Sequence, residues 1–244
     1  MNELRSHAPT AGVSLRLDWC SHEAAKYAVE HWHYSRRMPK GKLVRIGVWE
    51  DERFVGVVIF GTGANNRIGD PYSLTGEQVC ELVRIALCRH RQPVSRIIRV
   101  AVGMLRRIAP GLRLVVSYAD MEQGHHGGIY QASNWVYVGQ TEDRTAYENQ
   151  AGKRVHWKQV GATNATVYDG RWRMKKYARE SLRVVKIPPK HKYLMPLDDA
   201  MRKQILPLSR PYPKRERSVD SGTPVHQTGG EGAIPNRSLD SAYP

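Results

Sequence analysis

Apolar residues follow helical spacing near the N-terminus of the chain and extended spacing after it. Ser21 is a good N-cap, and it predicts a helix that begins there and ends near His33. Within this range Ala25, Ala28 and Val29 recur at the spacing of one helical face. We therefore expect an amphipathic first helix.

Apolar runs further along the chain predict strands. Residues 43–49 and 54–60 are rich in β-forming residues, and the polar residues between them have the length of a hairpin connection. Residues 81–87 predict a central strand, and residues 94–108 predict an amphipathic helix. Residues 112–139 then predict a buried strand, a polar turn, a short helix and a second strand. This order predicts an α+β fold with an α/β mixed sheet flanked by helices.

Positive charge is concentrated toward the C-terminus. The 244 residues carry a formal net charge of +15, and residues 171–217 alone hold fifteen basic and four acidic residues, an excess of +11. Such a segment suits a polyphosphate partner through counterion release, although a solvated charged tail is the alternative. We therefore divide the chain into an N-terminal tail (1–14), a catalytic domain (15–165), a basic extension (166–217) and a disordered tail (218–244).

Cysteine usage and hydropathy indicate the compartment. Cys20, Cys80 and Cys88 form no CxxC pair and no even framework, which argues against a secreted disulfide scaffold and against a structural zinc site. No apolar run approaches the roughly 20 residues needed to cross a bilayer, and the N-terminus lacks the apolar core of a signal peptide. We expect a cytoplasmic protein with no membrane partner.

Titratable residues gather where the strand that opens residues 112–139 ends. Asp120 closes this strand, and His125 and His126 lie in the turn after it. Ligands in α/β layers collect beyond the carboxyl ends of strands, so we expect the chemistry here. His33 and Tyr34 would join the site if the end of the first helix folds over the same opening.

Other polar residues lie on the predicted strands and the short helix. Ser117 and Tyr130 could donate hydrogen bonds to a substrate, although core packing of Tyr130 is equally open. Glu81 and Arg84 are an odd number of residues apart, which predicts that they point to opposite faces of a central strand. Charge there is costly unless it is paired or catalytic.

The turn before the short helix is a candidate substrate-binding segment. Gly127 and Gly128 precede a helix whose free N–H groups could hold a phosphate, and a simple flexible turn is the alternative. Gln123 is a further candidate substrate contact in the same turn.

Five segments resemble, in the same order, the Mom family of phage Mu type: HYSRRMPKGKLVRIGVWED, VVIFGTGA, CELVRIAL, SYADMEQGHHGGIYQASNWVYVG and KHKYLMPLD. The likeness spans residues 32–213. It implies an enzyme that converts adenine in DNA to its N6-carbamoylmethyl form and so protects phage DNA from host restriction. ELVRIAL and GIYQASNWVYVG also resemble the GNAT (N-acetyltransferase) superfamily, which implies a GNAT-like splayed central sheet.

The chemistry of the candidate residues suggests roles for them in such a reaction. Asp120 would act as a base or metal ligand, and Tyr34 and Ser117 would donate hydrogen bonds to the donor or to adenine. Arg84 would support the site electrostatically. The predicted reaction centre consists of His33, Tyr34, Ser117, Asp120, Tyr130 and Arg84.

A metal and a group donor are both implied. Mom-like proteins are associated with iron, and His33, His125 and His126 are candidate ligands, with structural capping or DNA-phosphate contact as alternatives. GNAT enzymes hold the CoA pyrophosphate on a glycine-containing loop after the central strand, where this chain reads RHRQPVSR without glycine, which argues against ordinary acetyl-CoA binding. The residues there that would contact acetyl-CoA or a related two-carbon donor are Arg89, Arg91, Ser95 and Arg96.

Double-stranded DNA is the implied partner. Because the adenine amine is shielded inside a duplex, we expect the target base to be flipped out. Trp172, Tyr177 and Tyr193 are interleaved with cations and could stack on unpaired bases. The candidate phosphate contacts are Arg36, Arg37, Lys40, Lys42, Arg171, Arg173, Lys175, Lys176, Lys190 and Lys192. Two alternatives stay open, namely an acyl-CoA-dependent N-acyltransferase acting on a small amine or a protein lysine, and a non-catalytic DNA-binding protein.

Overall fold

The computed structural model describes residues 12–63, 67–142, 144–161, 165–168, 171–174 and 177–214. In the ranges 165–168 and 171–174 it describes the backbone alone. The described residues divide into two compact units, one that ends at residue 115 and one that runs from residue 116 to residue 214. No helix in the described part of the chain is long and apolar enough to cross a membrane.

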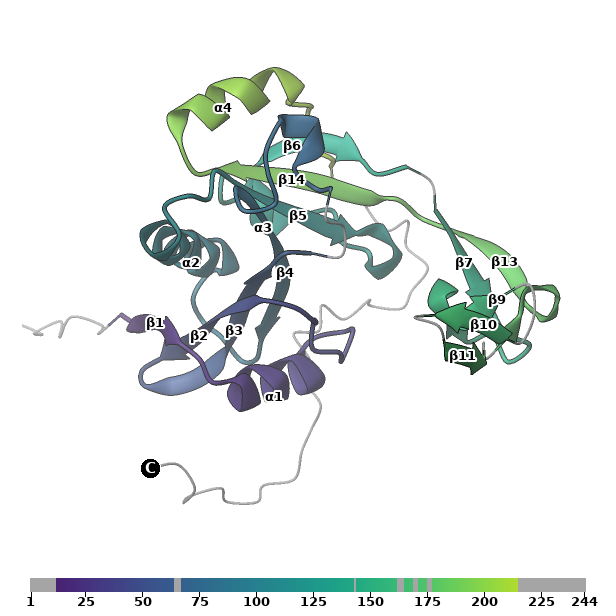
Figure 1. The fold of residues 1–244 in the computed structure, drawn as a ribbon. Coiled ribbons are helices and arrows are strands. Elements are labelled where there is room, and N and C mark those ends of the chain that lie inside the picture. The colour runs from purple at the N-terminus through teal and green to yellow at the C-terminus, as the bar shows by residue number, and fades with distance from the viewer. Residues whose placement is uncertain are drawn as a thin grey trace, which may run out of the picture. The chain divides into compact units, whose positions relative to one another are not determined.

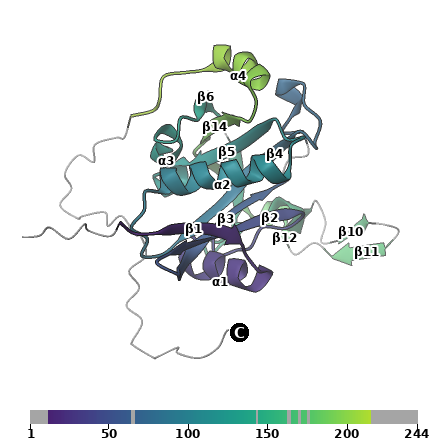
Figure 2. The same cartoon turned by 90° about the vertical axis from the view of Figure 1, so that its left-hand side faces the viewer.

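The first unit is built on antiparallel strands. Its described elements are β1 (Leu15–Trp19), α1 (His22–Trp32), β2 (Leu43–Glu50), β3 (Arg53–Gly61), β4 (Val79–Leu87), α2 (Val94–Ile108) and the start of β5 (Leu114–Asp120). The strands pair in the order β1-β2-β3-β4. Both views place β1 and β2 between α1 and α2 (Figures 1 and 2).

Helix α1 forms as its sequence predicts. The Ser21 hydroxyl accepts a hydrogen bond from the Ala24 N–H at 3.1 Å and caps the helix. Ala25, Ala28 and Val29 are fully buried and pack against apolar side chains of β3 and β4. This packing fixes the C-terminal end of α1, where His33 follows, on one face of the sheet.

The β2–β3 hairpin also follows from local sequence. Its turn residues Asp51 and Glu52 adopt left-handed backbone angles, with φ of 47° and 62°, as a two-residue hairpin turn of this hand requires. Glu50 is the last residue of β2, and it lies opposite Leu15 of β1 and Arg53 of β3. Strand β1 was not predicted, because it is a short edge strand.

The second unit contains the end of β5 and the elements after it. These are the 3-10 turn η2 (Met121–Gln123), α3 (Gly128–Gln131), β6 (Val136–Gln140), β7 (Arg144–Glu148), β8 (Arg154–Val155), β9 (Val160–Gly161), β10 (Ala165–Tyr168), β11 (Arg171–Met174), β12 (Tyr177–Ala178), β13 (Arg183–Ile187), β14 (Lys190–Pro196) and α4 (Asp199–Ile205).

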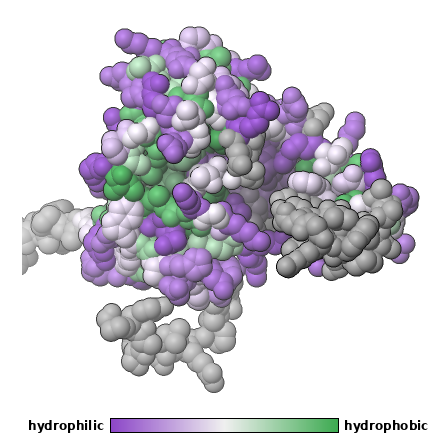
Figure 3. All heavy atoms as spheres, viewed as in Figure 1, coloured by the Kyte–Doolittle hydropathy of each residue, from purple (hydrophilic) through white to green (hydrophobic). Residues whose placement is uncertain are grey.

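Strand β14 builds the core of the second unit although it lies in the predicted basic extension. It runs antiparallel to β6, with Leu194 opposite Val136. Leu194 is fully buried, and α4, which packs on β14, buries Met201 and Ile205. The exposed side of α4 is mostly hydrophilic in Figure 3, where it lies at the top. The segment therefore contributes a strand and a helix to a folded layer.

In the described part of the chain, seven strands form one sheet in the order β1-β2-β3-β4-β5-β14-β6, and small sheets join β13-β7-β8, β12-β9 and β10-β11. Helices flank the large sheet (Figure 1). The predicted α+β fold with a mixed sheet flanked by helices is confirmed.

Candidate functional site

The end of β5 carries an acidic residue with a cationic partner. The Asp120 carboxylate pairs with the Lys190 ammonium group of β14, with 2.7 Å between Oδ2 and Nζ. The same carboxylate accepts the Glu122 N–H at 3.2 Å, and the Asp120 carbonyl accepts the His125 N–H at 3.1 Å. The Asp120 side chain keeps 12% of its surface exposed and the Lys190 side chain 27%. Both charged groups therefore remain accessible to solvent at the end of β5, the position at which the sequence predicts the reaction centre.

The glycine turn after η2 is pinned to β14. The His126 carbonyl accepts hydrogen bonds from the Tyr193 hydroxyl at 2.6 Å and from the Gln131 side-chain amide at 3.3 Å. Gly127 adopts φ +83°, and a Cβ at this position would collide with the Tyr193 ring. Glycine is therefore required here by backbone angle and by the close approach of an aromatic ring.

A pair of hydroxyls joins β5 to α3. The Ser117 hydroxyl donates to the Tyr130 hydroxyl oxygen at 2.8 Å, and both residues are buried. The Tyr130 ring lies 5.1 Å, between centroids, from both the Trp135 ring and the Tyr193 ring. This packing holds the turn that carries His125 and His126 against the sheet.

Burial shifts the protonation of several groups near this turn. Burial lowers the pKa of His191, and the nearby His126 lowers it further. Desolvation also lowers the pKa of His125, which Asp120 partly opposes. Burial raises the pKa of Tyr193 to about 12, and it lowers the pKa of Lys192. In each case burial disfavours the charged form of the group, which for the histidines and Lys192 is the protonated form.

Two further residues of the predicted reaction centre, His33 and Tyr34, lie after α1 in the first unit. His33 Nδ1 lies 2.8 Å from the Ser35 hydroxyl oxygen, and the His33 ring lies 4.2 Å from the Tyr34 ring. Tyr34 is 51% exposed. That His33 and Tyr34 meet Asp120 stays a prediction. The cations Arg36, Arg37, Lys40 and Lys42 that follow are all exposed.

Arg84 lies on the sheet face that α1 covers. A bulge in β4 makes Leu82 pair with Phe60 and Arg84 pair with Ile59, a residue that packs against α1. Glu81 pairs with Gly61, two residues from Ile59, so Glu81 and Arg84 share one face. The prediction that they point to opposite faces is wrong, because a bulge adds one residue and reverses the alternation.

The Arg84 guanidinium is incompletely bonded. Its Nη1 donates to the Val83 carbonyl oxygen at 2.6 Å, and its buried Nε has no hydrogen-bond partner among the described residues. A half-buried cation with a spare buried donor atom suits the predicted role of electrostatic support.

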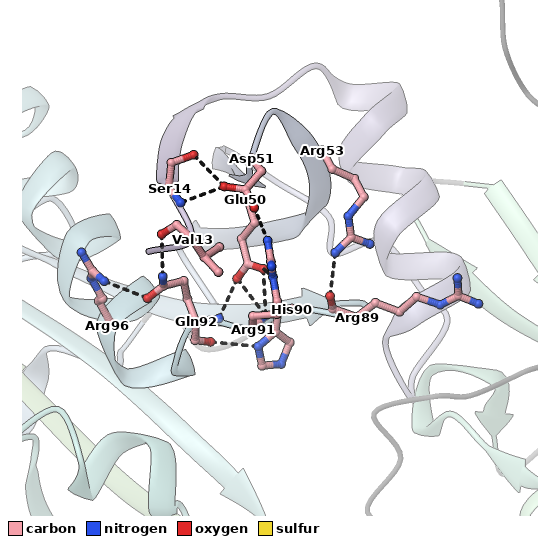
Figure 4. Close-up of polar contacts among 10 residues, drawn as sticks. All are labelled: Val13, Ser14, Glu50, Asp51, Arg53, Arg89, His90, Arg91, Gln92 and Arg96. Atoms are coloured by element: carbon pink, nitrogen blue, oxygen red, sulfur yellow. Dashed lines mark hydrogen bonds and ion pairs between the residues drawn. The ribbon is translucent and has the colours of Figure 1, made fainter. Parts of the chain in front are cut away.

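The loop between β4 and α2 holds the predicted donor contacts. Arg89, Arg91 and Arg96 lie around the buried Glu50 carboxylate, which accepts the backbone N–H groups of Arg91 and Gln92 (Figure 4). A carboxylate of the protein itself thus accepts the N–H groups of the loop that was predicted to contact the donor. Ser95 lies in the first turn of α2.

Metal ligands do not cluster in the described residues. No three His, Cys, Asp or Glu side chains there come close enough to hold one ion together. His33 belongs to the first unit and His125 and His126 to the second, and ligation of an ion by any of these histidines stays a prediction.

The remaining predicted substrate and phosphate contacts are distributed along the second unit. Gln123 is exposed in η2, and Lys192 is half-buried on β14. Arg171 and Arg173 lie on the β11 backbone, and Lys175 and Lys176 lie outside the described residues. The pairing of Lys190 with Asp120 had no sequence signal, because 70 residues separate the two positions.

Comparisons with known proteins place the chain in a family. Among solved structures it resembles spermidine/spermine N-acetyltransferase SpeG from Vibrio cholerae, with a TM-score of 0.41 and 10% identity, over 78% of this chain and 96% of that one. It also resembles FeeM, an N-acyl amino acid synthase from uncultured soil microbes, with a TM-score of 0.40 and 10% identity, over 81% of this chain and 97% of that one.

Sequence comparison is more decisive. The protein named Methylcarbamoylase mom of Escherichia phage Mu is 30% identical over 207 residues, which cover 82% of this chain and 84% of the phage protein. The Mom protein family is matched over residues 14–214, which include the end of β5, the glycine turn and β14. The chain therefore belongs to the Mom protein family.

Proposed function

We propose that this chain is a transferase that attaches a carbamoylmethyl group to the N6 amine of adenine in DNA, and that DNA so modified escapes host restriction. The observation that carries the proposal is the match over residues 14–214 to the Mom family, together with the identity to a phage methylcarbamoylase. The structure adds a residue arrangement suited to such a reaction at the end of β5.

Asp120 is the proposed base. The adenine amine is a weak nucleophile, because its lone pair is delocalised into the ring, and it must lose a proton as the new bond forms. In the proposed step N6 bonds to the methylene carbon of the donor, the bond to the leaving group breaks with its electron pair, and the N6 proton passes to Asp120. Lys190, at 2.7 Å, orients the carboxylate.

Ser117 and Tyr130 support the site from within the core. Their hydroxyls bond to each other at 2.8 Å and both side chains are buried, so we assign them to positioning the strand end and the glycine turn. Tyr34 is 51% exposed. It is therefore accessible enough to donate a hydrogen bond to adenine or to the molecule that supplies the carbamoylmethyl group. Arg84 supplies positive charge.

DNA would be held by exposed cations. Arg36, Arg37, Lys40 and Lys42 are exposed in the first unit. Lysine and arginine side chains bind the phosphate backbone with the release of counterions, and this binding positions a flipped adenine without reading sequence.

Mass spectrometry of nucleosides tests the proposal. Plasmid DNA from cells that express the chain should contain a modified deoxyadenosine with the mass of a carbamoylmethyl addition. Asp120→Asn should abolish this nucleoside, because the amide cannot accept the proton. Asp18→Asn makes the same chemical change at an exposed position of β1 and should leave the yield unchanged. Only ordinary nucleosides under good expression would contradict the function, and full activity of Asp120→Asn would contradict the assigned base.

A further inference from the structure

The loop between β4 and α2 is filled by a side chain of the protein itself. The Arg91 N–H lies 3.0 Å and 2.8 Å from the two carboxylate oxygens of Glu50, and the Gln92 N–H lies 2.7 Å from one of them. The Glu50 side chain is completely buried. Figure 4 shows the carboxylate at the centre of the loop, with both N–H groups directed at it.

The polar groups around this carboxylate are also engaged. The Arg91 guanidinium pairs with Asp51, and the Arg89 carbonyl accepts the Arg53 guanidinium at 2.7 Å. The Gln92 side chain donates to the Val13 carbonyl at 2.9 Å. The hydrogen-bond donors of the loop therefore bond to other groups of the protein. The end of the β2–β3 hairpin, which supplies Glu50 and Asp51, also places two acidic groups beside the loop.

Electrostatics then decide what the loop can bind. Backbone N–H groups before a helix bind phosphate because they are free donors in a positive field. Here a buried anion already accepts them, and charge-assisted hydrogen bonds of this kind are the stronger class. A pyrophosphate would have to displace the buried carboxylate or place its own charge against Glu50 and Asp51, and both are unfavourable.

We propose that Glu50 is a permanent internal anion of this loop and that the group donor is not anchored here by a pyrophosphate. The statement about the group donor rests on the proposed function. The statement that Glu50 occupies the loop does not depend on that function. The predicted contacts to the group donor, Arg89, Arg91 and Arg96, instead bond to Arg53, Asp51 and Gln92 of the protein. The donor is of a class that needs no pyrophosphate cradle at this position.

Amide hydrogen exchange on the full chain tests this directly. In the unaltered protein, peptides covering residues 88–96 should exchange at the same slow rate with and without saturating coenzyme A or inorganic pyrophosphate. Slower exchange of this loop upon addition of either compound would overturn the proposal. This measurement needs no DNA, so its failure is distinguishable from failure of the nucleoside assay.

Two variants provide a second test of the same proposal. Glu50→Gln should speed exchange of the Arg91 and Gln92 amides by roughly tenfold or more, because charged acceptors are worth more than neutral ones. Asp51→Asn, which removes a neighbouring charge that accepts neither amide, should leave their exchange rates close to those of the unaltered protein. Equal rates in both variants would overturn the proposal, and if Glu50→Gln fails to fold, the coenzyme A comparison on the unaltered chain still decides it.

Discussion

At the scale of single residues, both the backbone angle and the packing at position 127 require glycine. Its φ of +83° is costly for other residues, and a Cβ would also collide with the Tyr193 ring. We expect Gly127→Ala to lower the free energy of unfolding by about 2–4 kcal/mol, the sum of backbone strain and overpacking. Denaturant unfolding measures it.

Gly124 provides the matched control. It has a similar φ of +68°, but no atom lies within 4 Å of the position where its Cβ would be. Gly124→Ala should therefore show only the backbone cost, about 1 kcal/mol. An equal loss in the two variants would mean that the Tyr193 ring moves aside freely, contrary to the packing described.

Residue-level prediction from sequence succeeded where the signal is local. Asp120 at the end of a strand and the Ser21 cap were readable because each depends on its immediate neighbours. The partners of the charged groups were not readable, since Glu50 bonds to Arg91 across 41 positions. Charge pairing of this kind depends on the sheet order, which hydrophobic patterning does not specify.

At the scale of elements, the β6–β14 pair depends on a buried histidine. The Tyr137 hydroxyl lies 2.9 Å from His191 Nδ1, and burial lowers the pKa of His191. The folded protein thus resists protonation of this ring. The stabilising effect is complete above the unfolded pKa of about 6.5 and is lost as the pH falls through the lower folded value.

We therefore expect His191→Gln to flatten the fall in unfolding free energy below about pH 6.5. Glutamine keeps a polar group near Tyr137 but does not titrate. His22→Gln makes the same substitution at the exposed start of α1 and is the matched control. Thermal unfolding at several pH values measures this, and an unchanged slope in His191→Gln would contradict it.

Elements differ in how well the sequence predicts them. The bounds of α2 match the predicted 94–108, because helical spacing is a local property. Strand β14 was assigned to a basic extension, because its lysines dominate the local composition and its partner β6 lies about 50 residues earlier. Its role appears only once Tyr193 and Leu194 are seen to be buried in the sheet.

At the scale of the whole molecule, the net charge of +15 favours a polyanion partner without specifying where it binds. If the segment after α1 faces DNA phosphates, removing two of its cations should weaken binding and reduce the dependence on salt. We expect the variant Arg37→Ala with Lys40→Ala to reduce the slope of log affinity against log salt by about 2. Titration of a labelled duplex at several salt concentrations measures it.

The control must remove the same charge elsewhere, because net charge alone also attracts DNA. Arg202→Ala with Lys203→Ala does so on the exposed face of α4, at positions with no proposed DNA contact. Long-range attraction is screened within about 10 Å at 0.1 M salt, so this pair should change the slope far less. If the two variants lose affinity and slope equally, the protein attracts DNA by its overall charge and the segment after α1 is not a DNA contact.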